Sequence, residues 1–388
     1  MSEPRYYDVI VLGGGTMGTA AAWALGKRGL TTLVLERFHH VHDLGSHGGD
    51  TRVIRHAYAE SPEYVPLVRR ADRLWQELEI ATGEQVLVRC GGLELAAPGF
   101  AHARAARASA DAHGLSYEWL APDEVISRWP SFRVPADWDA LYSPDSGFLL
   151  TVPALRGMAN AARPLGATIL EQTQAVAWGA ELDSVWVDTT VKRYEAGALI
   201  VTAGAWSTQI LTELNLPIHI LRKTLWWQEV VDTGQFDPER FPVFITDSPA
   251  GEIYGFPIHG VPGLKIANHA GGEIVDPETV DRTTRPGENR DCLELAARVL
   301  PGVTSRAVKS AVCLYAMSPD TDFIVDRHPE LPQVAIGTGF SGHGFKFAPA
   351  IGELLADLVT NPLAESIPRL RLARFGRAGM ASSTSTPG

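Results

Sequence analysis

The sequence predicts an α/β fold in which a discontinuous Rossmann-type dinucleotide-binding domain is interrupted by a β-rich substrate domain with an antiparallel sheet. Three observations support this prediction: a β-α-β unit with a glycine-rich turn begins near residue 7, residues 219–270 alternate apolar and polar side chains, and α/β patterning returns after residue 330. A β-α-β unit indicates a parallel sheet, whereas alternation indicates an antiparallel one. No linker rich in Pro, Gly or Ser separates the parts, which favours interleaved domains.

The composition fits a globular protein of about two domains, at roughly 150 residues per domain. The chain has 388 residues, of which 45% are hydrophobic and 20% are charged. A net charge of −11 argues against a nucleic-acid partner, because binding to a phosphate backbone needs clustered Lys and Arg. The three cysteines are far apart and form no C-x-x-C pair, so we expect no metal, no disulfide framework and a reducing compartment.

The two ends of the chain bear on its location. The first residues lack the basic and apolar regions of a secretory signal, and the longest apolar runs are far below the ~20 residues that cross a bilayer. We therefore expect a cytoplasmic protein without a membrane partner. Residues 376–388 are rich in Ala, Ser, Thr and Gly, which predicts a disordered tail.

The first unit is a strand, a helix and a second strand. Tyr7–Leu12 is a short run rich in β-branched residues, and an Ala-rich helix is expected over Thr19–Lys27 with Gly29 as its C-cap. A second apolar strand follows over Thr31–Leu35. Parallel strands joined in this way are almost always connected in the right-handed sense. The start of the helix then presents free N–H groups, to which a phosphate binds.

Periodicity assigns the later elements in order. Helices are expected over 64–82, 100–113, 154–163, 292–300 and 348–359. Strands are expected over 92–96, 167–170, 185–187, 198–201, 225–231, 253–256, 264–267 and 333–336. On this pattern the dinucleotide-binding domain comprises residues 1–90, 145–215 and 305–375, and the substrate domain comprises 91–144 and 216–304.

The glycine-rich turn carries the pattern Gly13-x-Gly15-x-x-Gly18, which matches the dinucleotide-binding fingerprint. In that fingerprint the first glycine makes the tight turn, the second lets the backbone approach the pyrophosphate, and the third lets helix and strand pack closely. Glu36 ends the second strand, where a carboxylate accepts hydrogen bonds from ribose hydroxyls and disfavours a 2′-phosphate. NADP is therefore not expected, and the fingerprint alone leaves both FAD and NAD open.

Three later segments decide between these cofactors. They are GSHGGDTRVIRHAY at 45–58, AVCLY at 311–315 and GFSGHGFKF at 339–347. They strongly resemble the monomeric sarcosine oxidase and N-methyltryptophan oxidase family, FAD amine oxidases with a D-amino-acid-oxidase-like fold, and the resemblance extends over nearly the whole chain. It implies a flavin covalently attached through its 8α-methyl group to Cys313. One position departs from the family: the residue before Gly-Asp-Thr-Arg is usually histidine, and here it is Gly48.

The resemblance also implies roles for charged residues. Arg52 matches the arginine over the flavin ring, and Arg55 and Lys346 match the ligands of the substrate carboxylate. A guanidinium holds a carboxylate with two hydrogen bonds, and an ammonium adds a point charge. Lys265 matches the lysine that activates oxygen, where a fixed cation stabilises the developing superoxide. Further pocket residues implied by the resemblance are His269, Tyr254 and Tyr315.

Cofactor contacts are implied at many positions. They are Gly13, Gly15, Thr16, Met17, Gly18, Glu36, Arg37, Ser46, Thr51, Arg52, Gly204, Trp206, Cys313, Gly342, His343, Gly344 and Lys346. Arg52 and Arg55 are also the expected cations beside a Cys313 thiolate. Their spacing puts them on one face of a helix or on opposite faces of a strand, and the sequence leaves both open. Alternation places Lys265 alone on the face of its strand opposite its two apolar neighbours.

The predicted activity is FAD-dependent oxidation of a secondary (N-methyl) α-amino acid, with sarcosine as the expected substrate and O2 reduced to H2O2. The imine product would be hydrolysed, which gives glycine and formaldehyde from sarcosine. A larger substrate, N-methyltryptophan or a cyclic amino acid such as pipecolate, would use a roomier pocket lined by Trp226, Trp227, Tyr254 and Tyr315. Two alternatives of other classes are an NAD-linked dehydrogenase and a flavin-binding protein without turnover. The resemblance further implies a monomer.

Overall fold

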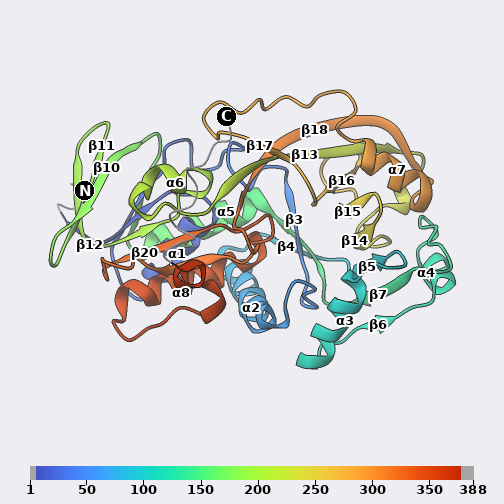
Figure 1. The fold of residues 1–388 in the computed structure, drawn as a ribbon, viewed down its shortest axis with the longest axis horizontal. Helices are drawn as coiled ribbons and strands as arrows, with labels where there is room; N and C mark the ends of the chain where they lie inside the picture. Colours follow the sequence, from blue (N-terminus) through green and yellow to red (C-terminus); the bar gives the residue numbers. More distant parts are fainter. Residues whose placement is uncertain (1–5, 377–388) are drawn as a thin grey trace.

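The computed structural model describes residues 6–376, so residues 377–388 of the predicted tail lie outside the described residues. Two large sheets organise the described chain, one of eight strands and one of nine. In Figure 1 the first lies with helices α1, α5 and α8, and the second lies with α3, α4 and α7. The bounds of these helices are α1 Thr16–Gly26, α3 His102–His113, α4 Pro122–Arg128, α5 Thr151–Ala162, α7 Arg290–Val299 and α8 Ala348–Thr360.

The eight-stranded sheet carries the glycine-rich turn. Its strands are β1 Tyr7–Leu12, β2 Thr32–Leu35, β9 Ala167–Leu170, β10 Ala175–Ala180, β11 Val185–Thr189, β12 Arg193–Val201, β19 Ile324–Arg327 and β20 Val334–Thr338. The order is β10–β11–β12–β1–β2–β9, with β20 beside β12 and β19 beside β20. β9, β2, β1, β12 and β20 are parallel neighbours. Parallel strands covered on both faces need continuous apolar runs, which explains the pattern of Tyr7–Leu12.

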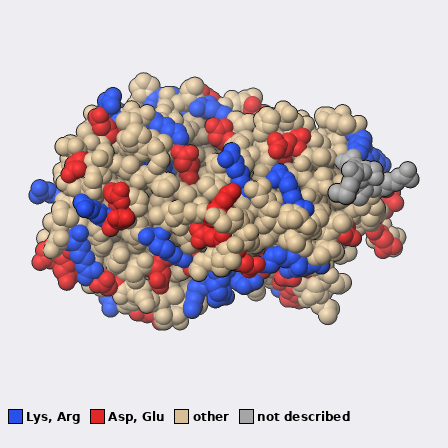
Figure 2. All heavy atoms as spheres, turned by 180° about the vertical axis from the view of Figure 1, so that it is seen from behind, with Lys and Arg blue, Asp and Glu red and all other residues tan. Residues whose placement is uncertain are grey.

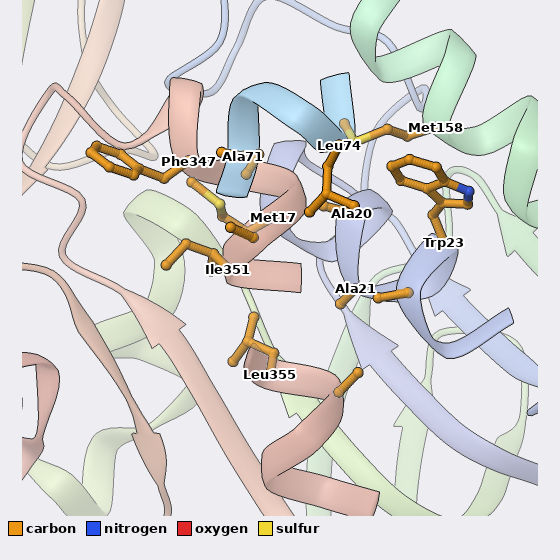
Figure 3. Close-up of a cluster of buried hydrophobic side chains, with 14 of the residues drawn as sticks. Met17, Ala20, Ala21, Trp23, Ala71, Leu74, Met158, Phe347, Ile351 and Leu355 are labelled. Atoms are coloured by element: carbon orange, nitrogen blue, oxygen red, sulfur yellow. The ribbon is translucent and has the colours of Figure 1, made fainter. Parts of the chain in front are cut away.

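A helical layer covers this sheet and buries a shared core (Figure 3). Besides α1, α5 and α8 it includes α2, Val65–Thr82. The labelled core residues are Met17, Ala20, Ala21, Trp23, Ala71, Leu74, Met158, Phe347, Ile351 and Leu355. α1 and α8 pack so closely that a Cβ at Gly352 would lie 2.5 Å from the Ala20 carbonyl carbon. Small residues therefore set the helix spacing and fix the start of α1 at the sheet edge.

The first helix differs from its prediction at both ends. It begins at Thr16 rather than Thr19, because the backbone turns helical immediately after Gly15. It ends with Lys27 as the C-cap, and the left-handed conformation, with a φ of +77°, comes two residues later at Gly29. Because the helix begins at Thr16, Gly18, the last glycine of the fingerprint, lies inside it.

The nine-stranded sheet forms the other half of the molecule. Its strands are β5 Gly92–Ala96, β6 Glu118–Trp119, β7 Asp139–Ser143, β13 His219–Val230, β14 Val243–Ser248, β15 Gly251–Phe256, β16 Leu264–Asn268, β17 Glu273–Ile274 and β18 Val303–Met317. The order is β17–β13–β16–β15–β14–β5–β7–β6, with β18 beside β13. All neighbours are antiparallel except β5 and β14. The predicted alternation holds, because Phe244, Ile253 and Ile266 share one buried core.

The longest strand, β18, was not predicted. Its first half is largely exposed and carries Ser305, Arg306 and Lys309, so the sequence shows no strand pattern there. It pairs with β13 over most of its length and places Cys313 directly opposite Lys223. β18 therefore belongs to the nine-stranded sheet, although the predicted boundary at residue 305 assigned most of it to the dinucleotide-binding part.

A three-stranded sheet decides whether the segment of Arg52 and Arg55 is a helix or a strand. It consists of β3 Thr51–Ile54, β4 Leu87–Arg89 and β8 Gly147–Leu150, in the order β3–β8–β4. Arg52 lies within β3 and Arg55 directly follows it, so this segment is extended and not helical. A short helix, α6 Ser207–Ile210, completes the described helices.

Charges are interspersed on the face shown in Figure 2, where Lys and Arg alternate with Asp and Glu. No helix within residues 6–376 is long and apolar enough to span a membrane.

Candidate active site

The first candidate site is a cavity of about 190 Å³ at the carboxyl ends of β1 and β12, which we call the cofactor cavity. Twelve of the predicted cofactor positions line it: Gly13, Gly15, Thr16, Met17, Glu36, Arg37, Ser46, Arg52, Gly204, Trp206, Gly342 and Gly344. The other five, Gly18, Thr51, Cys313, His343 and Lys346, are not among its lining residues. The carboxyl edge of a parallel sheet is where such folds bind nucleotides.

The three fingerprint glycines have different surroundings. Gly13 has a φ of +101°, and a Cβ there would lie 2.5 Å from the Thr202 carbonyl oxygen. At Gly18 a Cβ would lie 1.9 Å from the carbonyl oxygen of Gly13. At Gly15 a Cβ would meet no atom within 4 Å. Gly13 and Gly18 are therefore required by the protein itself, whereas the bare backbone at Gly15 leaves room for a pyrophosphate beside the start of α1.

Two backbone hydrogen bonds fix the Glu36 carboxylate where it can bind a ribose. Its Oε2 accepts a hydrogen bond of 2.9 Å from the Gly14 N–H, and its Oε1 accepts one of 2.8 Å from the Phe38 N–H. The side chain is buried at the end of β2 and lines the cofactor cavity. These residues fit a dinucleotide: a bare backbone for the pyrophosphate and a fixed carboxylate for the ribose hydroxyls.

Sequence reasoning missed other walls of this cavity, including Phe38, His42, His47 and Thr173. His47 is buried, and burial, followed by the nearby His42 and Arg52, lowers its pKa to about 3. A Cβ at Gly48 would lie 3.0 Å from the Asp43 carbonyl oxygen, so the backbone is tight where the family usually has histidine. In this chain the residue before Gly48, His47, lines the cofactor cavity.

A second cavity, of about 60 Å³, adjoins the first, and we call it the inner pocket. Arg52, Tyr315, Gly342 and Phe345 line both cavities. The inner pocket also contains Arg55, Tyr254, His269, His343 and Lys346, all predicted, together with Val53, Glu60, Ile245, Glu252 and Phe256. A molecule in the inner pocket therefore contacts whatever fills that end of the cofactor cavity.

Arg55 forms an ion pair with the carboxylate of Glu60 in the inner pocket. Its Nη2 donates to both carboxylate oxygens of Glu60, each at 2.7 Å, and its Nη1 donates to the Ala57 carbonyl at 3.0 Å. Burial disfavours the charged form of Glu60, but Arg55, His343 and Lys346 hold the pKa of this carboxyl well below its usual range. Glu60, which was not predicted, shows that Arg55 is placed to bind a carboxylate.

Lys346 supplies the second cation. It is 5% exposed, and its Nζ donates to the His343 carbonyl at 3.0 Å. Burial and repulsion by Arg55 lower its pKa to about 7, while Glu60 opposes this shift. An ammonium with so little compensation binds an additional anion favourably.

The aromatic residues form one wall of the inner pocket. The hydroxyls of Tyr254 and Tyr315 are 3.4 Å apart, and the His269 ring lies 5.5 Å from that of Tyr315. Burial lowers the pKa of His269 to about 4, so its ring is neutral near pH 7. The predicted Trp226 and Trp227 do not line either of these cavities. They leave opposite faces of their strand and pack in two different buried clusters, and the cluster of Trp227 includes Tyr315.

Lys223 was missed by the sequence reasoning and supports this wall. Its buried ammonium donates to three consecutive carbonyls, those of His269 at 3.0 Å, Ala270 at 2.7 Å and Gly271 at 2.8 Å. The preceding residue, Arg222, is also buried but bonds to Asp281, Thr283 and Glu288 away from the pocket. Lys223 therefore fixes the backbone that carries His269.

Lys265 and Cys313 lie behind the cavities. Lys265 is 2% exposed and donates to the Thr51 carbonyl at 2.8 Å and the Thr51 hydroxyl at 3.0 Å. This confirms that Lys265 leaves the face of its apolar neighbours. Cys313 is fully buried, and burial raises the pKa of its thiol, while Arg52, Lys265 and Lys223 act in the opposite sense. Arg55, expected beside this thiol, pairs with Glu60 instead.

His343 connects the flavin-edge segment to the pocket. Its Nδ1 hydrogen-bonds the Tyr58 hydroxyl, and its Nε2 lies 3.1 Å from the Thr321 carbonyl. Burial lowers the pKa of His343 to about 3. Its ring lines the inner pocket and not the cofactor cavity.

The inner pocket continues into a third cavity of about 580 Å³, which we call the vestibule. Glu60, Glu252, His269 and His343 line both. The vestibule adds His102, Asp247 and the backbone of residues 270–272.

A dinucleotide cavity joined to a cationic pocket fits an oxidoreductase that acts on an anionic substrate, and comparison with known proteins identifies the cofactor. Residues 8–358 match the FAD dependent oxidoreductase (DAO) family, and the chain belongs to this family. The prediction of an FAD enzyme is therefore confirmed, and the NAD-linked alternative does not hold.

Particular relatives sharpen this assignment. The chain is 38% identical to monomeric sarcosine oxidase from Bacillus sp. (strain B-0618), over 91% of this chain and 92% of the relative. It is 34% identical to N-methyl-L-tryptophan oxidase from Yersinia pestis (strain Pestoides F), over 95% and 99%. Among solved structures, L-proline dehydrogenase from P. horikoshii superposes with a TM-score of 0.84 at 23% identity, covering 97% of this chain and 99% of that one. This likeness confirms the predicted fold.

Proposed function

We propose that this enzyme oxidises secondary N-methyl α-amino acids, with sarcosine as the smallest candidate, and passes the electrons to O2. The observation that supports this most is the paired placement of Arg55 and Lys346 in a small pocket that shares walls with the cofactor cavity. The names of the relatives, sarcosine oxidase and N-methyl-L-tryptophan oxidase, point to the same chemistry.

The substrate carboxylate binds Arg55 and Lys346 in this proposal. Arg55 now holds Glu60 through two hydrogen bonds, so the incoming carboxylate takes over a geometry that already exists. Glu60 loses that partner when the substrate binds. Burial of the substrate amine near Arg55, Lys346 and Arg52 lowers its pKa, and the neutral amine is the form that is oxidised.

FAD, when bound, accepts the two electrons and the hydrogen that leave the C–H bond beside the substrate nitrogen. The product imine takes up water, so that sarcosine, water and O2 give glycine, formaldehyde and H2O2. The protein supplies position and charge rather than a base, since the pKa values of His269 and His343 are lowered to about 4 and about 3. Tyr254 and Tyr315 shield the reacting carbon from water.

Oxygen reduction is assigned to Lys265. Its ammonium is buried, although burial and Arg52 hold its pKa well below the ordinary value, and it anchors residues 49–51 beside Arg52. A fixed cation stabilises the developing superoxide. Lys265→Met should slow flavin reoxidation far more than reduction by substrate in stopped-flow measurements; equal effects on both half-reactions would contradict this role.

Covalent attachment of FAD at Cys313 is also proposed. Arg52, Lys265 and Lys223 oppose the rise that burial causes in the pKa of this thiol, and so favour the thiolate that attachment would need. Cys313 would hold the flavin through its 8α-carbon; replacing a C–H bond there by the C–S bond would release two electrons to the flavin, and O2 would take them up. Yellow colour should stay on the polypeptide after denaturation and filtration, and Cys313→Ala should release it. Colour that is released from the unaltered protein would rule out the attachment.

Peroxide release from a panel of sarcosine, N-methyl-L-tryptophan and pipecolate tests the activity itself. Release with any of them supports the proposal, and a yellow protein that none of them bleaches would indicate a flavin-binding protein without turnover. The vestibule supports the larger substrates as a second candidate, because it extends the inner pocket by about 580 Å³.

We further propose that the FAD domain comprises residues 1–90 and 145–215 with a C-terminal part, and that the substrate domain comprises 91–144 and a part from 216 onward. Membership of β18 in the nine-stranded sheet favours moving the last boundary from 305 to the end of β18. We also propose that the protein is a monomer, a proposal supported by its similarity to relatives named monomeric sarcosine oxidase.

A further inference from the structure

Arg55 and Lys346 share one aromatic neighbour, Tyr58, behind the inner pocket. The guanidinium carbon of Arg55 lies 4.5 Å from the centre of the Tyr58 ring, and Lys346 Nζ lies 5.2 Å from it. Both cations line the inner pocket, whereas Tyr58 is not among the lining residues of the three cavities described above. The ring therefore lies behind the two cations and does not face the substrate.

The two cations need such a neighbour, because like charges repel each other strongly where water is excluded. Repulsion by Arg55 is the second cause, after burial, of the lowered pKa of Lys346. The face of an aromatic ring carries negative charge and attracts a cation, most strongly in a desolvated site. Tyr58 is fully buried, so its face offsets part of the repulsion and keeps both charges close together.

A chain of hydrogen bonds fixes the orientation of this ring. His343 Nε2 lies 3.1 Å from the Thr321 carbonyl, which only accepts, so Nε2 carries the hydrogen. Burial lowers the pKa of His343 to about 3, so its ring is neutral near pH 7 and Nδ1 accepts from the Tyr58 hydroxyl. Thr321 has a φ of +62°, which is rare for a β-branched residue, and this strained turn points its carbonyl at His343.

Aromatic packing holds the ring from other sides. The ring centres of Tyr64 and Phe347 each lie 5.2 Å from that of Tyr58. Lys346 also lies 5.5 Å from the centre of the Phe347 ring, but within residues 6–376 neither Arg55 nor Lys346 lies over the ring of Tyr64. Tyr58 and Tyr64 are both buried in this aromatic cluster, and they differ in whether they face the cations.

We propose that Tyr58 is a positioning residue whose aromatic face holds Arg55 and Lys346 together as one receptor for the substrate carboxylate. Without that face the two cations would separate or the ammonium would lose its proton, and either change weakens the pair. A carboxylate would then bind less tightly, because part of its binding free energy would be used to reassemble the receptor. The inference rests on the proposed function.

Binding to the protein with FAD bound tests the inference without turnover. Calorimetry compares butanoate, in which a methylene group replaces the sarcosine nitrogen, with the uncharged butanamide. Tyr58→Phe keeps the aromatic face, so the ratio of the two affinities should stay within about threefold of that of the unaltered protein. Tyr58→trifluorophenylalanine keeps the ring but withdraws charge from its face, and it should lower the ratio about tenfold relative to Tyr58→Phe.

Tyr64→Leu is the matched control for the loss of a buried ring. Tyr58→Leu and Tyr64→Leu should lose comparable stability in thermal unfolding, but only Tyr58→Leu should lower the affinity ratio. Tyr58→Leu should also raise KM for sarcosine about tenfold with a smaller change in kcat. An equal fall in the ratio for both variants would indicate a general loss of structure and overturn the inference. If Tyr58→Leu does not fold, Tyr58→Phe and Tyr58→trifluorophenylalanine still decide.

The outcomes separate this inference from the proposed function. If sarcosine is oxidised but fluorination leaves the ratio unchanged, the function stands and the positioning role of Tyr58 is wrong. If fluorination lowers the ratio but no N-methyl amino acid is oxidised, the positioning role stands and the function is wrong. Equal binding of butanoate and butanamide by the unaltered protein overturns the inference, because no carboxylate receptor would then exist.

Discussion

The cofactor cavity and the inner pocket adjoin each other but are built by different means. The cofactor cavity is shaped by backbone: Gly13, Gly15 and Gly204 lie in its wall, and its one buried carboxylate, Glu36, is satisfied by backbone N–H groups. The inner pocket is shaped by charged side chains, among them Arg55, Glu60 and Lys346. The first cavity therefore selects by shape, and the second selects by charge.

This difference indicates which kind of substitution would damage each cavity. At Gly13 in the cofactor cavity an added methyl group would meet the Thr202 backbone, whereas in the inner pocket removal of the Arg55 charge would leave Glu60 without its partner.

The largest effect is expected at Gly18. In Gly18→Ala the new Cβ would lie 1.9 Å from the Gly13 carbonyl oxygen, so α1 must shift from the sheet edge and FAD binding should be lost. Overpacking of this kind costs ~1–3 kcal/mol or more. Absorbance of the purified protein and thermal unfolding measure both effects.

Gly15→Ala is the matched control. Its Cβ meets no atom within 4 Å, so the unfolding temperature of the FAD-free protein should stay unchanged while FAD affinity falls. A drop in the stability of FAD-free Gly15→Ala equal to that of Gly18→Ala would contradict the assigned division of roles.

Loss of Arg55 should be the strongest change in the inner pocket. Arg55→Met leaves Glu60, whose side chain is 27% exposed, without its partner; because Arg55 itself is buried, the cost should exceed the ~0–1 kcal/mol of an exposed pair. Chemical denaturation measures the stability, and calorimetry should detect no binding of a carboxylate ligand. Arg128→Met removes an exposed pair with Glu118 and should cost only ~0–1 kcal/mol. Equal losses in the two variants would mean that the Arg55 pair is not effectively buried.

A comparison of Lys223 with Arg222 tests whether Lys223 acts by positioning the backbone that carries His269. Lys223→Met frees the carbonyls of residues 269–271 and should raise KM about tenfold, equivalent to ~1.4 kcal/mol, with a smaller change in kcat. Lys223→Arg should restore part of the affinity. Arg222→Met removes a buried cation that holds a different loop, so KM should change little even if stability falls. A similar rise in KM for both variants would indicate a general loss of structure.

The smallest effect concerns pH. Lys346 binds a carboxylate as the ammonium, and its pKa is lowered to about 7, first by burial and then by Arg55. Carboxylate affinity should therefore be constant below pH 7 and fall above it, by at most about tenfold per pH unit. Because the folded pKa lies below the ordinary value of 10.5, the same group should favour folding as pH rises from about 7 to 10.5. Lys346→Met should abolish the pH dependence of binding; a dependence that survives would belong to another group.

The sequence determined the cofactor cavity well, because its determinants are local. The turn Gly13–Gly18 and Glu36 are close in the chain, and β-α-β geometry places them together without help from distant residues. The Ala-rich run after the turn likewise predicted helix α1, although the helix begins earlier than predicted, at Thr16.

The resemblance predicted much of the inner pocket, including Arg55 and Lys346, whereas only the tertiary structure showed its acidic residues and the vestibule. Glu60, Lys223 and Glu252 carry no motif. Glu60 is recognisable only through its ion pair with Arg55, and Lys223 and Glu252 only through partners far along the chain or on another strand. The exposed half of β18 hid its strand, and only pairing with β13 brought Cys313 opposite Lys223. Local sequence patterns specify the backbone shape that binds the cofactor. Charged side chains interact through space with residues that can be far along the chain. The arrangement of charges around the substrate therefore becomes visible only in the folded structure.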